Sequence, residues 1–268
     1  MRKSFALLLI MILPMLLIAQ DKSVAQNRLL VFRNVTVIDM RSEQPQPNMT
    51  VVVSGNRISK IGKNLRIPKD AQVVDASGKF LIPGLWDMYV FLFDNRDAPD
   101  AIHTDDYFPL LIANGVTGVR DMWTDPDDIK LIRRWQKEIE AGKMIGPRVA
   151  VGSSIVDGVP VIQKNSLGVN SPDEARQAVR TLKDAGAGFI RIYANLTRES
   201  YFAIADEAKK LKIPFAGLVP TSITAVEASN AGQKSIEHLN RMFIACSSKE
   251  DQFKNFKEQD WTAALFLE

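Results

Sequence analysis

The 268-residue chain has few of the residues that bind metals or form cross-links: two histidines, His103 and His238, and one cysteine, Cys246. Two histidines exclude any mechanism that requires a cluster of imidazoles. A single cysteine excludes an intrachain disulfide, so the stability must come from a hydrophobic core. Long apolar runs are also scarce, since the clearest one, residues 5–19, is shorter than the about 20 residues of a membrane-spanning helix. A multispan membrane protein is therefore excluded.

The N-terminal segment is typical of an export signal. A basic start at residues 1–3 precedes the apolar run, and cleavage is expected after Ala19 or after Ala25, where Ser23 and Ala25 are small residues at the −3 and −1 positions. We expect residues 1–25 to be a cleaved signal peptide and the protein to be exported, to a periplasm or to the extracellular space. An uncleaved N-terminal membrane anchor is the alternative.

Most of the excess positive charge of the chain lies in this segment. The formal net charge is +3, and cleavage after Ala19 lowers it to +1 because two basic residues are removed. No basic footprint of the kind that binds nucleic acid remains, so we expect no nucleic-acid partner.

The rest of the chain divides into two patterns. Residues 26–79 contain short β-like runs separated by turn signals, which predicts a small antiparallel β domain. From Phe80 on, short apolar runs alternate with longer helical patterns, which is typical of an α/β protein with βα units. Six strands are predicted in residues 80–268, at 80–93, 116–122, 148–153, 189–193, 214–219 and 234–239.

The helices between these strands have recognisable boundaries. Ser171 is expected to be an N-cap with Glu174 three residues later, and Pro126 suits the first position of another helix. Glycines follow the helical patterns at Gly115, Gly142, Gly186 and Gly232, as C-terminal caps do. This order indicates a (β/α) TIM-barrel-like domain. Because a closed barrel needs about 250 residues and no strand is predicted after Leu239, we expect about six of eight βα units.

Four stretches of sequence carry a family resemblance. They are VDASGKFLIPGLWDM at residues 74–88, NGVTGVRD at 114–121, AGKMIGPR at 141–148 and QKSIEHL at 233–239. Together with the preceding β domain, they resemble the amidohydrolase superfamily, and in particular its imidazolonepropionase-like and prolidase-like branch.

The resemblance implies a barrel whose relatives hydrolyse C–N bonds of dipeptides, cyclic amides or N-acyl amino acids with zinc or another divalent metal. Their usual ligands are a His-x-His pair on strand one, a carboxylated lysine on strand four, a histidine on each of strands five and six, and an aspartate on strand eight. Such metals lower the pKa of a bound water and polarise the scissile carbonyl.

Most of these ligand positions are substituted in this chain. The strand-one pair is replaced by Tyr89 and Phe91, the lysine by Arg191 and the strand-five histidine by Leu218. A guanidinium stays protonated and forms no carbamate. Only His238 matches a ligand position, and no strand is predicted for the aspartate. Since a metal site needs three or four protein ligands, we expect no metal cofactor.

Three functional hypotheses follow. The first is an amidohydrolase-like scaffold without hydrolytic activity. The second is a secreted binding or interaction module, which takes a small molecule or peptide, or self-associates through open sheet edges. The third is a residual hydrolase with a rearranged site made from Asp87, Asp94, Asp121, Glu237 and His238. A gene remnant without a selected role is a further alternative. Tyr193 lies near the predicted barrel mouth and is a candidate substrate contact.

Overall fold

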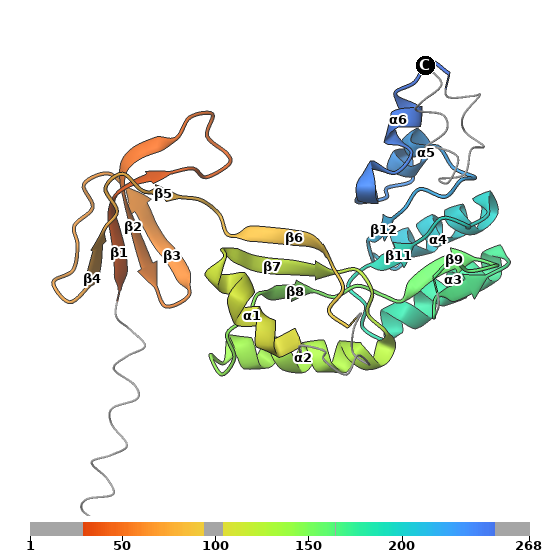
Figure 1. Ribbon diagram of the computed structural model, residues 1–268, viewed down its shortest axis with the longest axis horizontal. Coiled ribbons are helices and arrows are strands. Elements are labelled where there is room, and N and C mark those ends of the chain that lie inside the picture. The colour runs from red at the N-terminus through yellow and green to blue at the C-terminus, as the bar shows by residue number, and fades with distance from the viewer. Residues whose placement is uncertain (1–28, 94–103, 164, 250–268) are drawn as a thin grey trace, which may run out of the picture. The chain divides into compact units, whose positions relative to one another are not determined.

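The computed structural model describes residues 29–93, 104–163 and 165–249, and the chain divides into a first unit, residues 1–83, and a second unit, residues 84–268. Each unit is considered by itself (Figure 1). The predicted export signal, Asp94 and His103 lie outside the described residues. Among the residues that are described, every helix is too short or too polar to cross a bilayer.

The first unit is a five-stranded sheet. Its order is β3-β2-β1-β4, and β5 also pairs with β1. The strands are β1 (Leu30–Val37), β2 (Gln46–Ser54), β3 (Arg57–Gly62), β4 (Gln72–Asp75) and β5 (Phe80–Leu81). The first three are antiparallel, as predicted, whereas β4 and β5 run parallel to β1. A separate small core, with Val35 and Val51 buried, holds this sheet together.

The second unit begins with a parallel sheet in the order β6-β7-β8. Its elements are β6 (Leu85–Val90), α1 (Thr104–Ala113), β7 (Val116–Asp121), α2 (Pro126–Glu140) and β8 (Arg148–Ala150). Helices α1 and α2 lie on the same side of these strands in Figure 1. A strand, a helix and a parallel strand repeat here as the sequence pattern predicts.

A second parallel sheet follows, in the order β10-β9-β11-β12. Its elements are β9 (Ile155–Gly158), β10 (Leu167–Val169), α3 (Pro172–Asp184), β11 (Ile190–Ile192), α4 (Arg198–Lys210), β12 (Phe215–Gly217), α5 (Ala225–Asn230), a 3₁₀ turn (Glu237–Leu239) and α6 (Met242–Ala245). Fully buried side chains such as Ile132 of α2, Val179 of α3 and Ile204 of α4 belong to one core in this unit. The (β/α) fold class is thus confirmed.

Two predicted strands differ in the structure. The run at 80–93 is divided into β5 and β6 at Pro83, which has no backbone N–H for a ladder. The run at 234–239 is reduced to one bridge between Ile236 and Gly217, followed by the 3₁₀ turn. The backbone leaves the extended region there, because His238 has φ +58° and Leu239 has φ +53°. Strands β9 and β10 were not predicted.

The helix boundaries follow the predicted chemistry. The Ser171 hydroxyl accepts a hydrogen bond from the Glu174 N–H, and the Glu174 carboxylate accepts one from the Asn170 N–H rather than from Ser171 itself. Only half of the predicted capping box is therefore present. The four predicted C-terminal glycines all have positive φ, between +67° and +99°.

Replacing Ser171 with alanine tests this N-cap. We expect the free energy of unfolding to fall by about 1 kcal/mol, because the Glu174 N–H loses its acceptor. Urea unfolding followed by circular dichroism measures the change. The control is Thr181→Ala on the exposed face of α3, which should change stability by less than about 0.5 kcal/mol. Equal effects for the two variants would show that the cap contributes nothing.

Candidate functional site

Five residues singled out in the sequence meet in the second unit. The Arg191 guanidinium carbon lies 5.6 Å from the ring centroid of Tyr89, 5.2 Å from that of Phe91 and 5.7 Å from that of Tyr193. The Tyr89 ring is also 4.5 Å from the His238 ring, in an edge-to-face arrangement. These five side chains form what we call the Arg191 cluster. It lies toward the carboxyl ends of β6 and β11, the end at which barrel enzymes place their active sites.

Arg191 is held from several directions. Its guanidinium donates hydrogen bonds to the Met122 carbonyl (2.8 Å) and to the Tyr89 hydroxyl (2.9 Å). Its backbone N–H donates to the Ser153 hydroxyl (2.9 Å). Only 3% of the residue is exposed. The side chain is therefore fixed in position at the centre of the cluster.

The charge of Arg191 has no acidic partner, because it forms no ion pair with any residue that the structure describes. Burial lowers the pKa of its guanidinium, while the nearby Tyr89, Tyr193 and Glu237 raise it. The faces of aromatic rings attract a cation through their quadrupole. Three rings, one carbonyl and one phenol therefore replace the carboxylate that usually accompanies a buried arginine.

Two further positions of the predicted ligand set contribute little to metal binding. Leu218 is buried directly after β12, and its aliphatic side chain offers no donor atom. His238 is exposed. Burial raises the pKa of the Tyr89 hydroxyl, which disfavours the phenolate.

The cluster does not fit a divalent cation. Across the described ranges 29–93, 104–163 and 165–249, no three His, Cys, Asp or Glu side chains group together so as to hold a metal. The donor chemistry of the cluster agrees with this finding, since its centre is a guanidinium with its N–H groups turned to oxygen acceptors. Such a group repels a cation instead of ligating it.

The carboxylates of the rearranged-site hypothesis have local partners instead. Asp87 accepts a hydrogen bond from the Tyr89 N–H (3.0 Å). Glu237 forms a buried salt bridge with Arg120 at 2.8 Å and accepts a hydrogen bond from the Ser235 hydroxyl at 2.6 Å. Within the part of the chain that the structure describes, these acids do not come together in a group that could hold one metal ion.

Arg120 is the residue that the sequence reasoning missed. Its guanidinium also donates to the Met88 carbonyl and to the Ser235 hydroxyl, both at 2.8 Å. One side chain on β7 therefore connects β6 with the segment that precedes the 3₁₀ turn. The sequence feature that points to Arg120 is its position in the NGVTGVRD stretch, next to Asp121.

Asp121 is fully buried at the end of β7. Its carboxylate accepts hydrogen bonds from the Leu92 N–H (3.0 Å) and from the Thr124 hydroxyl. Burial raises its pKa from 3.8 to about 6, although these hydrogen bonds lower it. A carboxyl group with a raised pKa binds its proton more tightly in the folded state than in the unfolded state.

This proton makes the stability depend on pH. The contribution is fully present below about pH 4 and is lost as the pH rises through about 6. Relative to Asp121→Asn, the wild-type free energy of unfolding should therefore fall by up to about 3 kcal/mol between pH 4 and pH 7. Urea unfolding at both pH values measures the difference. The exposed Asp127→Asn variant is the control, and its difference from the wild type should not change with pH. If the difference in free energy of unfolding between the wild type and Asp121→Asn were also the same at both pH values, the raised pKa of Asp121 would be contradicted.

The chain is similar to known proteins in sequence and in structure. No family model matches the chain. The dihydroorotase of Geotalea daltonii is 42% identical over 53 residues, which cover 20% of this chain and 12% of that protein. The dihydroorotase of Trichlorobacter lovleyi is 40% identical over 65 residues, covering 24% of this chain and 15% of that protein.

The structural likeness is more extensive. A putative prolidase from Bifidobacterium longum has a TM-score of 0.61 and 23% identity, over 81% of this chain and 56% of that one. An Xaa-Pro dipeptidase solved with bound methionine in its active site has a TM-score of 0.62 and 24% identity, over 78% and 61% of the two chains. Phenylurea hydrolase B has a TM-score of 0.62 and 20% identity, over 80% of this chain and 60% of that one. The chain thus spans little more than half the length of these solved proteins.

Proposed function

Since the chain has the amidohydrolase fold that the sequence resemblance predicted, we propose that it is a non-catalytic form of that scaffold. In this proposal the buried cation of Arg191 occupies the place of the metal centre. The single observation that carries the proposal is the Arg191 cluster, in which the carboxylated-lysine position and both strand-one positions contribute to one closed arrangement.

Electrostatics supports this proposal. A divalent ion about 5 Å from a guanidinium charge would be repelled by about 7 kcal/mol at an effective dielectric constant of about 20. The free energy of metal binding would have to exceed this repulsion, although His238 is the only imidazole that the cluster offers as a ligand. The cluster therefore favours a metal-free state.

Hydrolysis assays test the proposal. We expect the purified chain to cleave Xaa-Pro dipeptides and N-acyl amino acids no faster than buffer does, with or without added zinc or manganese. An active prolidase assayed in parallel shows that the conditions permit turnover. Metal-stimulated hydrolysis above the buffer rate would refute the non-catalytic assignment.

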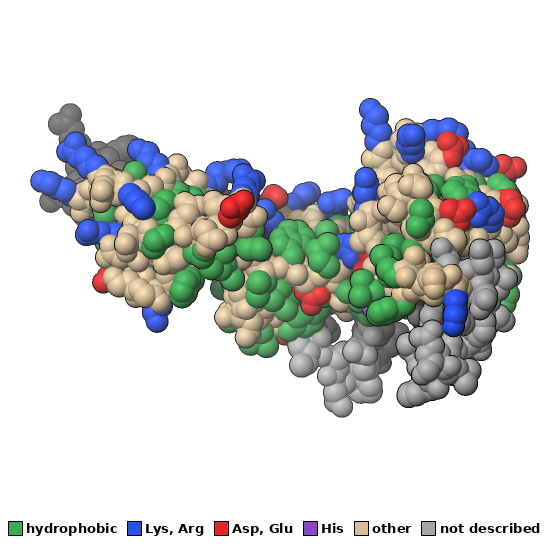
Figure 2. Space-filling view, turned by 90° about the horizontal axis from the view of Figure 1, so that it is seen from above, with side chains coloured by type: hydrophobic (Ala, Val, Ile, Leu, Met, Phe, Trp, Pro, Cys, Tyr) green, Lys and Arg blue, Asp and Glu red, His purple; other side chains and the backbone are tan. Residues whose placement is uncertain are grey.

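An interaction role is the second candidate, and the edge of β6 favours it. Among the described strands, β6 pairs only with β7. Leu85, Trp86 and Met88 on this strand are each about half exposed, and Figure 2 shows hydrophobic side chains gathered over this part of the molecule. An unpaired apolar edge is a template for another strand. We propose that two copies pair through β6, since one strand can meet its equivalent across a two-fold axis.

A charge on this edge should prevent the pairing. We expect the wild-type chain to sediment as a dimer at micromolar concentration and Met88→Lys to sediment as a monomer, because lysine on an edge strand opposes pairing. Sedimentation velocity measures both. Lys143→Met, at an exposed position in the turn after α2, is the control and should leave the dimer unchanged. A monomeric wild-type chain would exclude this role.

Export is proposed on the basic start and apolar run of residues 1–25. N-terminal sequencing of the protein recovered from a bacterial periplasm or culture medium should find a chain that begins after Ala19 or Ala25. An intact N-terminus in the membrane fraction would indicate the uncleaved anchor instead.

A further inference from the structure

The charge of the chain is divided unevenly between its two units. Residues 29–83 contain eight basic and four acidic residues, a net charge of +4, whereas residues 84–268 contain 22 basic and 26 acidic residues, a net charge of −4. The small net charge of the whole chain conceals this difference. Lys and Arg side chains also outnumber acidic ones on the face of the first unit that Figure 2 shows at the left. The positive charge is thus concentrated in the small β unit.

Most of the basic residues of this unit recur at every third position of one segment, as Arg57, Lys60, Lys63, Arg66 and Lys69, with no acidic residue between them. We call residues 57–69 the basic segment. It comprises β3 and much of the connection to β4. All five basic side chains are exposed, and none forms an ion pair with a residue that the structure describes.

The acidic residues of the first unit do not neutralise this segment. Asp39 and Asp75 accept hydrogen bonds from serines in their own turns, and Glu43 lies in the same connection as Asp39. Asp70 adjoins the segment in the sequence, but it is one anion beside five cations. The basic segment therefore has a positive potential that an external anionic surface can neutralise.

Apolar side chains alternate with these charges. Ile58 is 57% exposed and Ile61 is 47% exposed. Both lie on β3, which is at the edge of its sheet because, among the described strands, it pairs only with β2. Lysine on an edge strand opposes pairing with another strand. Exposed isoleucines among basic residues instead suit the interface of a bilayer, where apolar side chains enter the acyl boundary and lysine ammonium groups stay at the surface.

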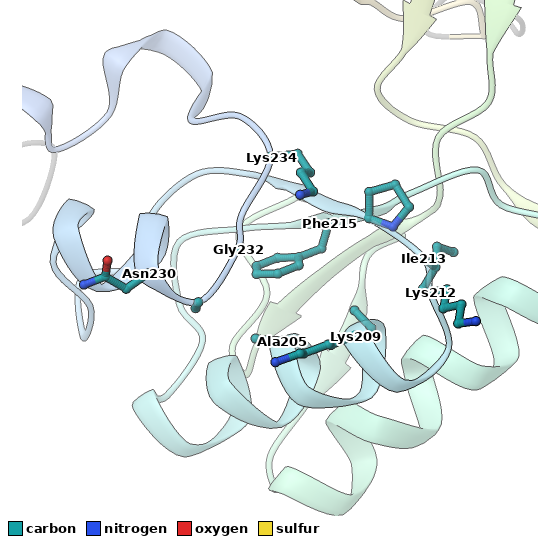
Figure 3. A pocket seen from close by; sticks show the side chains of 11 residues that line it. Ala205, Lys209, Lys212, Ile213, Phe215, Asn230, Gly232 and Lys234 are labelled. Carbon is teal, nitrogen blue, oxygen red and sulfur yellow. The ribbon is translucent and has the colours of Figure 1, made fainter.

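Exposed lysines of the second unit lack this arrangement. Lys209, Lys212 and Lys234 line a cavity of about 430 Å³ beside β12. Their side chains point in separate directions (Figure 3), and Phe215, which also lines the cavity, is only 3% exposed. These three lysines therefore share neither a common ligand position nor an accessible apolar surface, and they provide a matched control.

We propose that the basic segment binds the surface of an anionic lipid bilayer. Its five cations meet the lipid phosphates, and Ile58 and Ile61 enter the boundary between headgroups and acyl chains. The unit follows the proposed export signal of residues 1–25, or the uncleaved anchor, and both bring it to a membrane. This binding function belongs to the first unit and goes beyond the non-catalytic assignment of the second.

Partition into lipid vesicles tests the proposal on the full chain. Vesicles of phosphatidylcholine alone give the baseline, which includes any contribution of residues 1–25, and vesicles with about 30% phosphatidylglycerol add the anionic surface. Lipid titration followed by sedimentation of the vesicles gives both partition coefficients. Since each basic residue near an anionic surface strengthens binding about fivefold, we expect the wild-type coefficient to be on the order of 1,000-fold larger for the anionic vesicles.

Three variants separate the contributions of the segment. K60Q/K63Q/K69Q should lower the preference for anionic vesicles about 100-fold, because three of the five cations are lost. K209Q/K212Q/K234Q removes the same charge at exposed positions of the second unit and should partition as the wild type does. I58S/I61S should lower partition into anionic vesicles about tenfold, since it removes the apolar side chains that enter the boundary.

Equal partition of the wild type into both kinds of vesicle would overturn the proposal, as would equal losses in the two lysine variants. Undiminished partition of I58S/I61S would mean that the segment recognises charge alone, which would favour a soluble polyanion as the partner and overturn the bilayer. Circular dichroism spectra that match the wild type establish that the variants are folded.

Discussion

Arg191→Ala is expected to lower the free energy of unfolding of the second unit by about 3 kcal/mol. The variant loses charge-assisted hydrogen bonds to the Met122 carbonyl and the Tyr89 hydroxyl, each worth about 1.5–3 kcal/mol. It also loses three ring contacts of about 0.5–2 kcal/mol each and leaves a cavity. Removal of a buried charge relieves several kcal/mol of desolvation, which offsets part of this loss.

Urea unfolding followed by tryptophan fluorescence measures this effect, since all four tryptophans belong to the second unit. Arg191→Lys keeps the charge but not the planar fork, so we expect it to lose less stability than alanine does. Arg134→Ala, at an exposed position of α2, is the control and should stay within about 0.5 kcal/mol of the wild type. If Arg191→Ala were as stable as the wild type, the cluster would not be held together by its cation.

The salt bridge between Arg120 and Glu237 should give the second large effect. Both side chains are only 10% exposed, and removal of one partner leaves the other charge buried. We expect Arg120→Met to lower the free energy of unfolding by about 3–5 kcal/mol. Part of this loss comes from the Met88 carbonyl and the Ser235 hydroxyl, to which Arg120 also donates.

A double-mutant cycle isolates the pair itself. Arg120→Met combined with Glu237→Leu should be less destabilising than the sum of the single changes by about 1–3 kcal/mol, because the second substitution removes the uncompensated charge. The exposed pair Arg134 and Glu138 provides the matched control, with a coupling energy below about 1 kcal/mol. Additive losses at Arg120 and Glu237 would show that the two charges are not coupled.

The features predicted correctly from the sequence are those determined by local chemistry. The Ser171 cap depends on residues within four positions of each other, and the glycine at the end of a helix depends on its own φ. The antiparallel strands β1 to β3 follow from short β-like runs separated by turn signals. The parallel pairing of β4 and β5 with β1 joins segments far apart in the chain, and the turn signals do not encode it.

The features that were missed depend on distant partners. The apolar pattern around Ile236 is that of a strand, but only one bridge forms before His238 takes a left-handed conformation. Arg120 is bonded to a carboxylate 117 residues away, which no spacing rule reveals. The family resemblance predicts that Tyr89 and Arg191 are substituted ligand positions, yet the contact between them appears only when β6 and β11 are folded. Whether Tyr193 contacts a substrate stays a prediction; in the structure its ring faces Arg191.

The most direct test of the central claim is the metal content of the purified chain after incubation with excess zinc and removal of free ion, measured by inductively coupled plasma mass spectrometry. The Arg191 cluster predicts much less than one zinc per chain, and no gain in thermal stability on zinc addition. One or two tightly held zinc ions per chain, with a raised melting temperature, would contradict the proposal that a guanidinium occupies the place of the metal centre.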